Sequence, residues 1–296
     1  MDNVFIVGCG DIGLRVARLW RDRGATVAGL VRSGAAVMKL RAAGITPVAG
    51  DLDLPLSLRG LTLEGRLVYY FAPPPASGEG DPRMAAFVAA LALAGRPARI
   101  VYISTSGVYG DHGGALVSEE TPPAPATDRA RRRLAAEETL RAFGRDHQVP
   151  VVILRVGGIY GPGRLPEERL RQGLPVLRLE ESGPTNRIHA DDLAAISVAA
   201  GERGQPDAVY NVSDGQSGTM TEYFYAVADA LGLPRPPAIS LEEAKHVLTP
   251  AMLSYLTESR RLDNRRMLAE LGITLRYPDL ASGLAQSLAP ADRPRP

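Results

Sequence analysis

The sequence predicts an α/β fold in which a parallel sheet is covered by helices on both faces. Short apolar runs alternate with longer amphipathic segments through the first 160 residues, and this alternation is typical of β-α-β units. The runs are apolar throughout, as expected for central strands that are buried on both faces. A glycine-rich turn follows the first run directly, which indicates a strand, a tight turn and a helix in succession.

The individual elements follow from this pattern in chain order. Strands are predicted at residues 4–7, 26–31, 46–49, 67–71, 99–104 and 151–155, and helices at 11–23, 83–94 and 128–145. Right-handed crossovers between parallel strands then give a doubly wound sheet of the Rossmann type. After about Gly161 the alternation breaks down into short segments. We therefore predict a Rossmann domain at residues 1–160 and a smaller α/β lobe at 161–296, some of whose segments return to the sheet.

Charge and composition limit which binding partners and which cellular compartment are expected. The formal net charge is +1, so nothing indicates a nucleic acid or an anionic membrane surface as partner. Cys9 is the only cysteine. With a first strand that leaves no room for a signal peptide, this predicts a cytoplasmic protein. No apolar run reaches the ~18 residues of a membrane span. Four scattered histidines and a lone cysteine offer no metal site.

Residues 8–13 read Gly-Cys-Gly-Asp-Ile-Gly, a G-x-G-x-x-G motif between a predicted strand and a predicted helix. In this context the motif binds a dinucleotide. Gly8 allows the tight turn, Gly10 lets the backbone approach a pyrophosphate, and Gly13 lets the helix pack closely on the strand. A glycine-rich turn without a ligand is the alternative. The predicted cofactor contacts in this dinucleotide-binding domain are Gly8, Gly10, Asp11, Ile12 and Gly13.

The end of the second predicted strand favours NADP over NAD. Sites for NAD place an acid here to hold the ribose hydroxyls, whereas this chain has Arg32 and Ser33. Arg32 can pair with the 2′-phosphate of NADP and Ser33 can add a hydrogen bond, although a solvated surface arginine is the simple alternative. Asp51 and Leu52 are expected over the adenine, with a turn-capping role as the alternative for Asp51. Further expected cofactor contacts at strand ends are Phe71, Ala72, Pro73 and Ser104.

Four later segments resemble signatures of the extended short-chain dehydrogenase/reductases, the NAD-dependent epimerase/dehydratase family. The segments lie at 101–110, 154–163, 187–193 and 210–214. The resemblance implies an enzyme in which a tyrosine, assisted by a lysine four residues on, exchanges a proton with a substrate hydroxyl while nicotinamide exchanges a hydride. It also implies that Thr105, at the family's serine or threonine position, orients that hydroxyl. A threonine that caps the local backbone is the alternative.

The tyrosine and lysine of that mechanism are missing from this chain. Matching the predicted helix to the family places Arg129 at the tyrosine and Arg133 at the lysine. The only lysines are Lys39 and Lys245, so no shifted alignment restores a Tyr-x-x-x-Lys pair. Arginine supplies positive charge but no proton near neutral pH. We therefore expect Arg133 to act in catalysis through its charge, and Arg129 to bind an anionic group of the substrate.

Another residue must then move the proton. Tyr109, just beyond Thr105, and Tyr160, in the segment that leaves the strand at 151–155, are candidates, although either ring could serve packing alone. His189 titrates in a suitable range but precedes an expected helix start, which favours a structural role. The predicted catalytic residues are Thr105, Tyr109 and Arg133, and the predicted substrate-binding residues are Ser106, Arg129, Tyr160 and Arg187.

Two departures from the family bear on the substrate. Gly158 stands where nucleotide-sugar enzymes usually have asparagine, and Thr185 where they often have arginine. The favoured function is an NADP(H)-dependent oxidoreductase acting on a carbonyl or secondary alcohol, such as a sterol-like or sugar-derived compound. The alternatives are a non-catalytic NADP(H)-binding regulatory protein and a nucleotide-sugar epimerase or dehydratase. The resemblance also suggests a homodimer through the helix at 128–145 and its neighbour.

Overall fold

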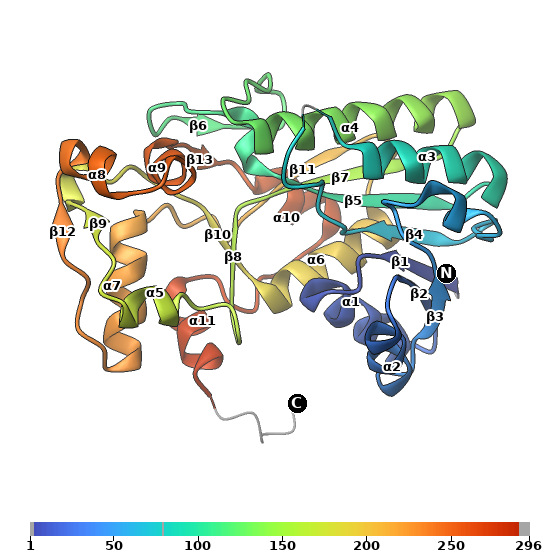
Figure 1. The fold of residues 1–296 in the computed structure, drawn as a ribbon, viewed down its shortest axis with the longest axis horizontal. Helices are drawn as coiled ribbons and strands as arrows, with labels where there is room; N and C mark the ends of the chain where they lie inside the picture. Colours follow the sequence, from blue (N-terminus) through green and yellow to red (C-terminus); the bar gives the residue numbers. More distant parts are fainter. Residues whose placement is uncertain (1–2, 79, 290–296) are drawn as a thin grey trace.

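The computed structural model describes residues 3–78 and 80–289, and a seven-stranded sheet forms its centre (Figure 1). The strand order is β11-β7-β5-β4-β1-β2-β3, with every neighbouring pair parallel. The order reverses between β1 and β4, which is the topology of a doubly wound Rossmann sheet. This confirms the predicted fold class. The strands are β1 (Asn3–Val7), β2 (Thr26–Val31), β3 (Thr46–Ala49), β4 (Leu67–Tyr70), β5 (Arg99–Thr105), β7 (Val151–Val156) and β11 (Val209–Val212).

A hydrophobic core covers each face of the sheet. Val4 and Ile6 point into one core while Phe5 and Val7 point into the other, because successive side chains of a strand alternate between faces. All four are buried, which explains why β1 is apolar throughout. One face carries α1 (Asp11–Arg21), α2 (Gly34–Ala42), α6 (Ala190–Arg203) and α10 (Arg265–Leu271), and the other carries α3 (Pro82–Ala94) and α4 (Asp128–His147).

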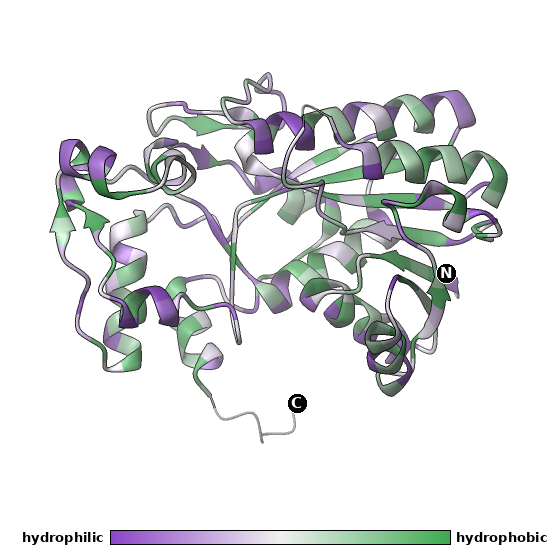
Figure 2. Ribbon diagram, in the orientation of Figure 1, coloured by the Kyte–Doolittle hydropathy of each residue, from purple (hydrophilic) through white to green (hydrophobic). Residues whose placement is uncertain are grey.

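A third hydrophobic core lies apart from the sheet, inside a smaller lobe that is drawn on the left of Figure 1. Tyr223, Phe224 and Val227 of one lobe helix contribute to it. Figure 2 shows mainly hydrophobic residues along the central strands, whereas the helices of this lobe carry both hydrophilic and hydrophobic residues. The lobe elements are α5 (Glu167–Arg171), β9 (Val176–Leu177), η3 (Leu179–Glu181), α7 (Met220–Leu231), β12 (Ala238–Ile239), α8 (Leu241–Val247), α9 (Pro250–Thr257) and α11 (Leu280–Ser287).

Short parallel ribbons connect the lobe to the sheet. β8 (Gly158–Tyr160) pairs with β10 (Arg187–His189), and β6 (Leu116–Val117) pairs with β13 (Arg261–Leu262). β9 and β12 form a third pair within the lobe. Two 3-10 turns complete the sheet region, η1 (Pro55–Leu58) and η2 (Ser106–Tyr109), which directly follows β5.

The observed elements differ from the predicted ones mainly at their ends. The helix predicted at 11–23 ends at Arg21, and the helix predicted at 128–145 continues to His147. The sequence pattern did not indicate α2. The last part of the predicted lobe, 290–296, lies outside the described residues. Among the described helices, none combines the length and the apolar character that a membrane crossing requires.

Candidate active site

Three glycines shape the turn between β1 and α1. Gly8 has φ +98°, and a Cβ there would lie 2.5 Å from the backbone nitrogen of Ala72, so only glycine fits. A Cβ on Gly13 would lie 2.5 Å from the carbonyl oxygen of Gly8, because α1 packs directly on the turn. Gly10 would place its Cβ in open space, and it precedes α1 without a side-chain cap. The first N–H groups of α1 therefore face a space that suits a pyrophosphate.

Asp11, the first residue of α1, is held between two arginines. Its Oδ1 accepts a hydrogen bond from Nε of Arg15 at 2.8 Å, and its Oδ2 accepts one from Nη1 of Arg164 at 3.2 Å. Arg15 also pairs with Asp191 at the start of α6. Since Arg164 follows β8, this chain of ion pairs ties the glycine turn to the smaller lobe. Ile12 points into the core beneath α1, which leaves only its backbone for a cofactor.

A cavity of about 220 Å³ lies beside the turn, at the carboxyl ends of β1, β2, β3 and β4. Asp53 and Arg83 line it without having been predicted, because neither belongs to a motif. Asp53 accepts two hydrogen bonds of 2.7 Å from Arg83 and lies 3.8 Å from Arg32. The Arg83 hydrogen bond lowers the pKa of Asp53. The predicted cofactor residues among its lining are Gly8, Arg32, Asp51, Leu52, Ala72 and Pro73.

Three predicted cofactor residues, Ser33, Asp51 and Phe71, have side-chain contacts within the protein. Ser33 Oγ accepts a hydrogen bond from the backbone N–H of Ala36 at 3.3 Å and caps α2. Asp51 likewise accepts one from the N–H of Asp53 at 3.0 Å, which is its alternative turn-capping role. Phe71 packs against the core below α1. Ser104 is buried, and its hydroxyl finds no hydrogen-bond partner within the described residues. The cofactor contacts of these four residues, and those of the residues that line the cavity, stay predictions.

Thr105 and Arg133 both lie at the carboxyl end of β5. Thr105 Oγ1 accepts a hydrogen bond from the N–H of Gly107 at 3.2 Å, and the side chain lines a second cavity. Arg133 Nη1 donates to the carbonyl oxygen of Ile103 at 3.0 Å and to the hydroxyl of Tyr102 at 3.3 Å. α4 thus holds the Arg133 guanidinium against the end of β5, but Arg133 lines neither of the two cavities at the strand ends, and its catalytic role stays a prediction.

Tyr109 does not fit the predicted role of proton donor. Its side chain is fully buried, its hydroxyl donates to Oδ1 of Asn211 at 2.7 Å, and the Arg155 guanidinium lies 4.8 Å from its ring centre. Burial raises the pKa of this hydroxyl. Tyr109 also does not line either of the two cavities at the strand ends. The prediction was wrong in orientation, because position along the chain does not reveal which way a turn directs its side chain.

The second cavity, of about 280 Å³, lies between the ends of β5 and β7 and the smaller lobe. The structure brings together five predicted residues from separate elements here: Thr105, Ser106, Arg129, Tyr160 and Arg187. The hydroxyl of Tyr160 donates to the carbonyl oxygen of Asp279 at 3.3 Å, and burial raises its pKa. Tyr160 therefore contributes its ring, rather than a proton, to the cavity wall.

Positive charge dominates this cavity. Its lining includes four arginines and one carboxylate, namely Arg129, Arg164, Arg187, Arg260 and Glu258. Arg187 is 7% exposed, donates to the carbonyl oxygen of Thr219 at 3.2 Å and lies 4.3 Å from the ring centre of Tyr223. Burial lowers the pKa of this arginine. A buried guanidinium without a carboxylate within ion-pair distance, among the described residues, favours an anionic ligand.

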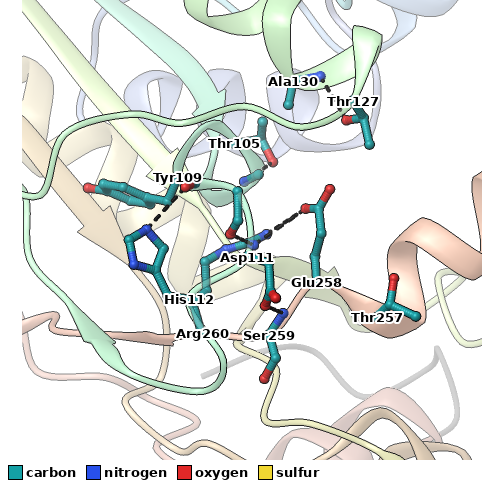
Figure 3. Close-up of polar contacts among 12 residues, drawn as sticks. Thr105, Tyr109, Asp111, His112, Thr127, Ala130, Thr257, Glu258, Ser259 and Arg260 are labelled. Carbon is teal, nitrogen blue, oxygen red and sulfur yellow. Dashed lines mark hydrogen bonds and ion pairs between the residues drawn. The ribbon is translucent and has the colours of Figure 1, made fainter.

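Glu258 and Arg260 are functional candidates that sequence reasoning missed. Arg260 donates to Oε2 of Glu258 at 3.3 and 3.4 Å and also to the carbonyl oxygen of Gly110. Figure 3 shows the Glu258 side chain extending from the lobe toward Thr105. The two residues lie in a polar stretch without a motif, so only the fold reveals their position.

Tyr223 and Tyr255 also line the cavity from α7 and α9. Burial raises the pKa of Tyr223 to about 12. The Arg129 guanidinium lies 5.5 Å from the Tyr255 ring centre. His189 is outside this lining, and its Nδ1 accepts a hydrogen bond from the N–H of Asp191 at 3.2 Å, which is the predicted structural role. No cluster of three metal-ligating side chains occurs within 3–78 and 80–289.

The parallel sheet, the glycine turn and the two cavities at its carboxyl edge define a dinucleotide-binding protein of the Rossmann class. The sequence profile of the NAD dependent epimerase/dehydratase family matches residues 4–213. The chain belongs to this family, and the expected resemblance is confirmed.

Several known proteins are similar to this chain over nearly its whole length. Protein YeeZ of Escherichia coli K12 is 28% identical over 298 residues, which are 94% of this chain and 97% of YeeZ. A solved conserved protein of unknown function from Silicibacter pomeroyi is 32% identical, with a TM-score of 0.81 over 97% of this chain and 98% of its own. A UDP-glucuronic acid 4-epimerase from Bacillus cereus, solved in complex with NAD, is 18% identical, with a TM-score of 0.73 over 96% of each chain. The epimerase shares the fold.

Proposed function

We propose that the protein is an NADP(H)-dependent oxidoreductase that acts on a carbonyl or secondary alcohol of a small anionic molecule. One observation carries the proposal: Thr105 and four arginines share a cavity at the same sheet edge as the glycine turn. In doubly wound sheets, ligands bind across this edge at the point where strand order reverses. The first cavity spans that point and the second lies beyond it at the ends of β5 and β7, so a dinucleotide can extend from one to the other.

The residues fit a dinucleotide from its adenosine end to its nicotinamide end. Leu52 and Asp51 line the 220 Å³ cavity, which we call the adenosine cavity, and Gly10 leaves space for the pyrophosphate. Arg133 lies at the end of β5, the strand that leads into the 280 Å³ cavity, which we call the reaction cavity. The bound nicotinamide supplies or accepts the hydride. Thr105 then orients the reacting oxygen with its hydroxyl, and Arg133 contributes positive charge close to it.

NADP is preferred over NAD in this proposal because Arg32 and Arg83 both line the adenosine cavity. Asp53 pairs with both and would compete with a 2′-phosphate for them. Calorimetric titration with NADPH and NADH tests the preference. We expect tighter binding of NADPH, and its loss in Arg32→Ala. Equal affinities would contradict the preference for NADP, tighter binding of NADH would favour NAD, and binding of neither would remove the cofactor from the proposal.

The substrate is proposed to carry a carboxylate or phosphate. The buried Arg187 and the exposed Arg129 face one small cavity from opposite elements, and each can pair with an oxyanion. Oxidation of NADPH should be followed with matched panels of neutral and anionic ketones and aldehydes. Turnover of anionic members only would support the proposal. NADPH binding without turnover of any member would favour a non-catalytic, cofactor-responsive regulator.

A nucleotide-sugar epimerase or dehydratase is the second candidate. It is favoured by the family assignment and by the arginines, because a nucleotide diphosphate is also an anion that guanidinium groups bind. Such a reaction returns the hydride within one cycle, so net NADPH oxidation would be absent. Chromatography and mass spectrometry of UDP- and dTDP-sugars after incubation would reveal it, because an epimerase yields a separable isomer of unchanged mass and a dehydratase yields a product lighter by a water molecule.

A homodimer through α4 and its neighbour is proposed as the assembly. α3 and α4 lie side by side on one face of the sheet (Figure 1), and Leu93 near the end of α3 is 81% exposed. Light scattering of the purified chain should give twice the chain mass. A monomeric mass would contradict the proposal.

A further inference from the structure

We propose that Glu258 is the proton donor and acceptor that replaces the family tyrosine, and this role rests on the oxidoreductase function proposed above. At the tyrosine position, Arg129 has no proton to give near neutral pH. The proton must come from another residue that lines the cavity. Glu258 is the single carboxylate among the described residues of that lining.

The Glu258 carboxylate is oriented by one neighbour. Oε2 accepts both hydrogen bonds from Arg260, whose guanidinium is also anchored on the carbonyl oxygen of Gly110. Oε1 is buried and has no hydrogen-bond partner within the described residues. A buried oxygen left without a donor costs roughly 1–3 kcal/mol. A substrate hydroxyl would supply that donor.

The backbone beside Glu258 is fastened to the sheet side of the cavity. The N–H of Ser259 donates to Oδ1 of Asp111 at 2.8 Å, and the carbonyl oxygen of Ser259 accepts from the N–H of His112 at 2.9 Å. β13 then pairs with β6. Figure 3 shows this attachment below the turn that follows Thr105, with the Glu258 carboxylate pointing toward that threonine. The carboxylate and the Thr105 hydroxyl can therefore act on one substrate oxygen.

The other titratable side chains of the cavity fit the role less well. Burial raises the pKa values of Tyr160 and Tyr223, which makes each a weaker acid than free tyrosine, and the Tyr160 hydroxyl already donates to a carbonyl oxygen. Tyr255 remains as a competitor, because it lines the cavity and is 46% exposed. The experiment must therefore separate Glu258 from Tyr255.

In the proposed reaction, a hydride and a proton reach the substrate carbonyl from two separate groups. In reduction, the carbonyl carbon of the substrate takes the hydride supplied by NADPH and the C=O π bond breaks toward oxygen. That oxygen takes the proton of the Glu258 carboxyl group, so that C–H and O–H bonds form. The substrate gains two electrons and NADP⁺ is released. Solvent returns the proton to the Glu258 carboxylate, and oxidation of the alcohol runs the same steps in reverse.

The test uses Glu258→Gln and Tyr255→Phe, with Glu138→Gln as a matched control on the exposed side of α4. Kinetics use whichever anionic carbonyl compound the wild type reduces. Glu258→Gln should lower kcat by ~10²–10⁴-fold and remove the pH dependence of kcat, because amide cannot transfer the proton. Its calorimetric affinity for NADPH and its KM should stay within about threefold of wild type. Tyr255→Phe and Glu138→Gln should retain kcat.

Chemical rescue gives a readout that a purely structural role would not move. Glu258→Ala should be inactive and should regain turnover when formate is added, because formate can occupy the space of the lost carboxylate. A kcat of Glu258→Gln near wild type, loss of kcat in Tyr255→Phe instead, or absence of formate rescue would overturn the role of Glu258 alone. A wild type that reduces no panel member would overturn the proposed function, and this role with it.

Discussion

Gly10 precedes α1 and Gly13 lies in its first turn, yet a methyl group would meet different surroundings at each. In Gly13→Ala the Cβ would lie 2.5 Å from the carbonyl oxygen of Gly8, so the turn must shift. We expect a lower melting temperature and loss of NADPH binding. In Gly10→Ala the Cβ would have no protein atom within 4 Å, so the melting temperature should be retained. NADPH affinity should still fall ~10-fold or more, because the methyl group fills the pyrophosphate space.

Calorimetry and thermal melting of both variants check this contrast. Wild-type NADPH affinity in Gly10→Ala would contradict the assignment of that space to the cofactor. Equal loss of melting temperature in both variants would contradict the packing argument.

Asp214 should make stability depend on pH. Burial raises its pKa from 3.8 to about 7, against hydrogen bonds and the positive charge of Arg187, which lower it. The folded state therefore holds the proton more tightly than the unfolded state. Its contribution to stability is complete below pH ~4 and is lost as pH rises through about 7. Melting temperatures from pH 4 to 8 should fall more steeply for wild type than for Asp214→Asn. Parallel curves would contradict the prediction.

Residue-level reasoning from sequence selected positions that a family motif, or the missing tyrosine and lysine, made conspicuous. Thr105, Arg129 and Arg187 were expected near the substrate and share one cavity. Asp53 was missed because its partner Arg83 lies 30 positions further along the chain. Glu258 was missed because it belongs to no motif, and only the fold brings it to the cavity that Thr105 lines. The error at Tyr109 has a similar origin, since its direction depends on Asn211, 102 positions further on.

α4 and β7 are joined by a buried ion pair between Glu137 and Arg155. Nη2 of Arg155 lies 2.8 Å from Oε2 of Glu137, and the side chains are 2% and 0% exposed. Glu137→Ala would leave the arginine charge buried without its partner. We expect the free energy of unfolding to fall by ~3–5 kcal/mol, measured by urea denaturation.

Glu138→Ala is the matched control for this element, because the neighbouring glutamate is exposed. Its unfolding free energy should change by less than ~0.5 kcal/mol. Similar losses in the two variants would show that the pair does not hold the helix on the strand.

At the scale of elements, the sheet strands were predictable and the lobe was not. Strands such as β5 and β7 are buried on both faces and therefore appear as continuous apolar runs. β6, β9, β12 and β13 have two residues each, which is too short for any periodic pattern. α2 buries only Leu40, so its sequence carries little sign of an amphipathic face.

At the scale of the whole molecule, an ion pair between Arg164 and Asp11 joins the lobe to the glycine turn. Arg164 shields the Asp11 carboxylate, which stands at the proposed pyrophosphate position. In Arg164→Gln the Asp11 carboxylate keeps Arg15 as its partner but loses the second positive charge, so its repulsion of the pyrophosphate should weaken NADPH binding by about 2- to 5-fold. Asp11→Asn in the same background should restore the affinity. Calorimetry checks both, with Arg171→Gln as a control at an exposed arginine of the lobe.

Unchanged affinity in Arg164→Gln would show that the lobe does not influence the cofactor site. Weak binding that Asp11→Asn fails to restore would indicate direct contact of Arg164 with the cofactor.

Residues 258–262 attach to the turn after β5, and they are synthesised long after that turn. Asp111 and Ser259 are joined by a hydrogen bond although 148 positions separate them in the chain. Every strand of the central sheet has left the ribosome before Glu258 is made, since β11 ends at Val212. The nascent chain can thus acquire its cofactor-binding half early. The wall that carries Glu258 closes the substrate cavity only when synthesis is nearly complete, so premature termination would release a chain that holds cofactor without reacting.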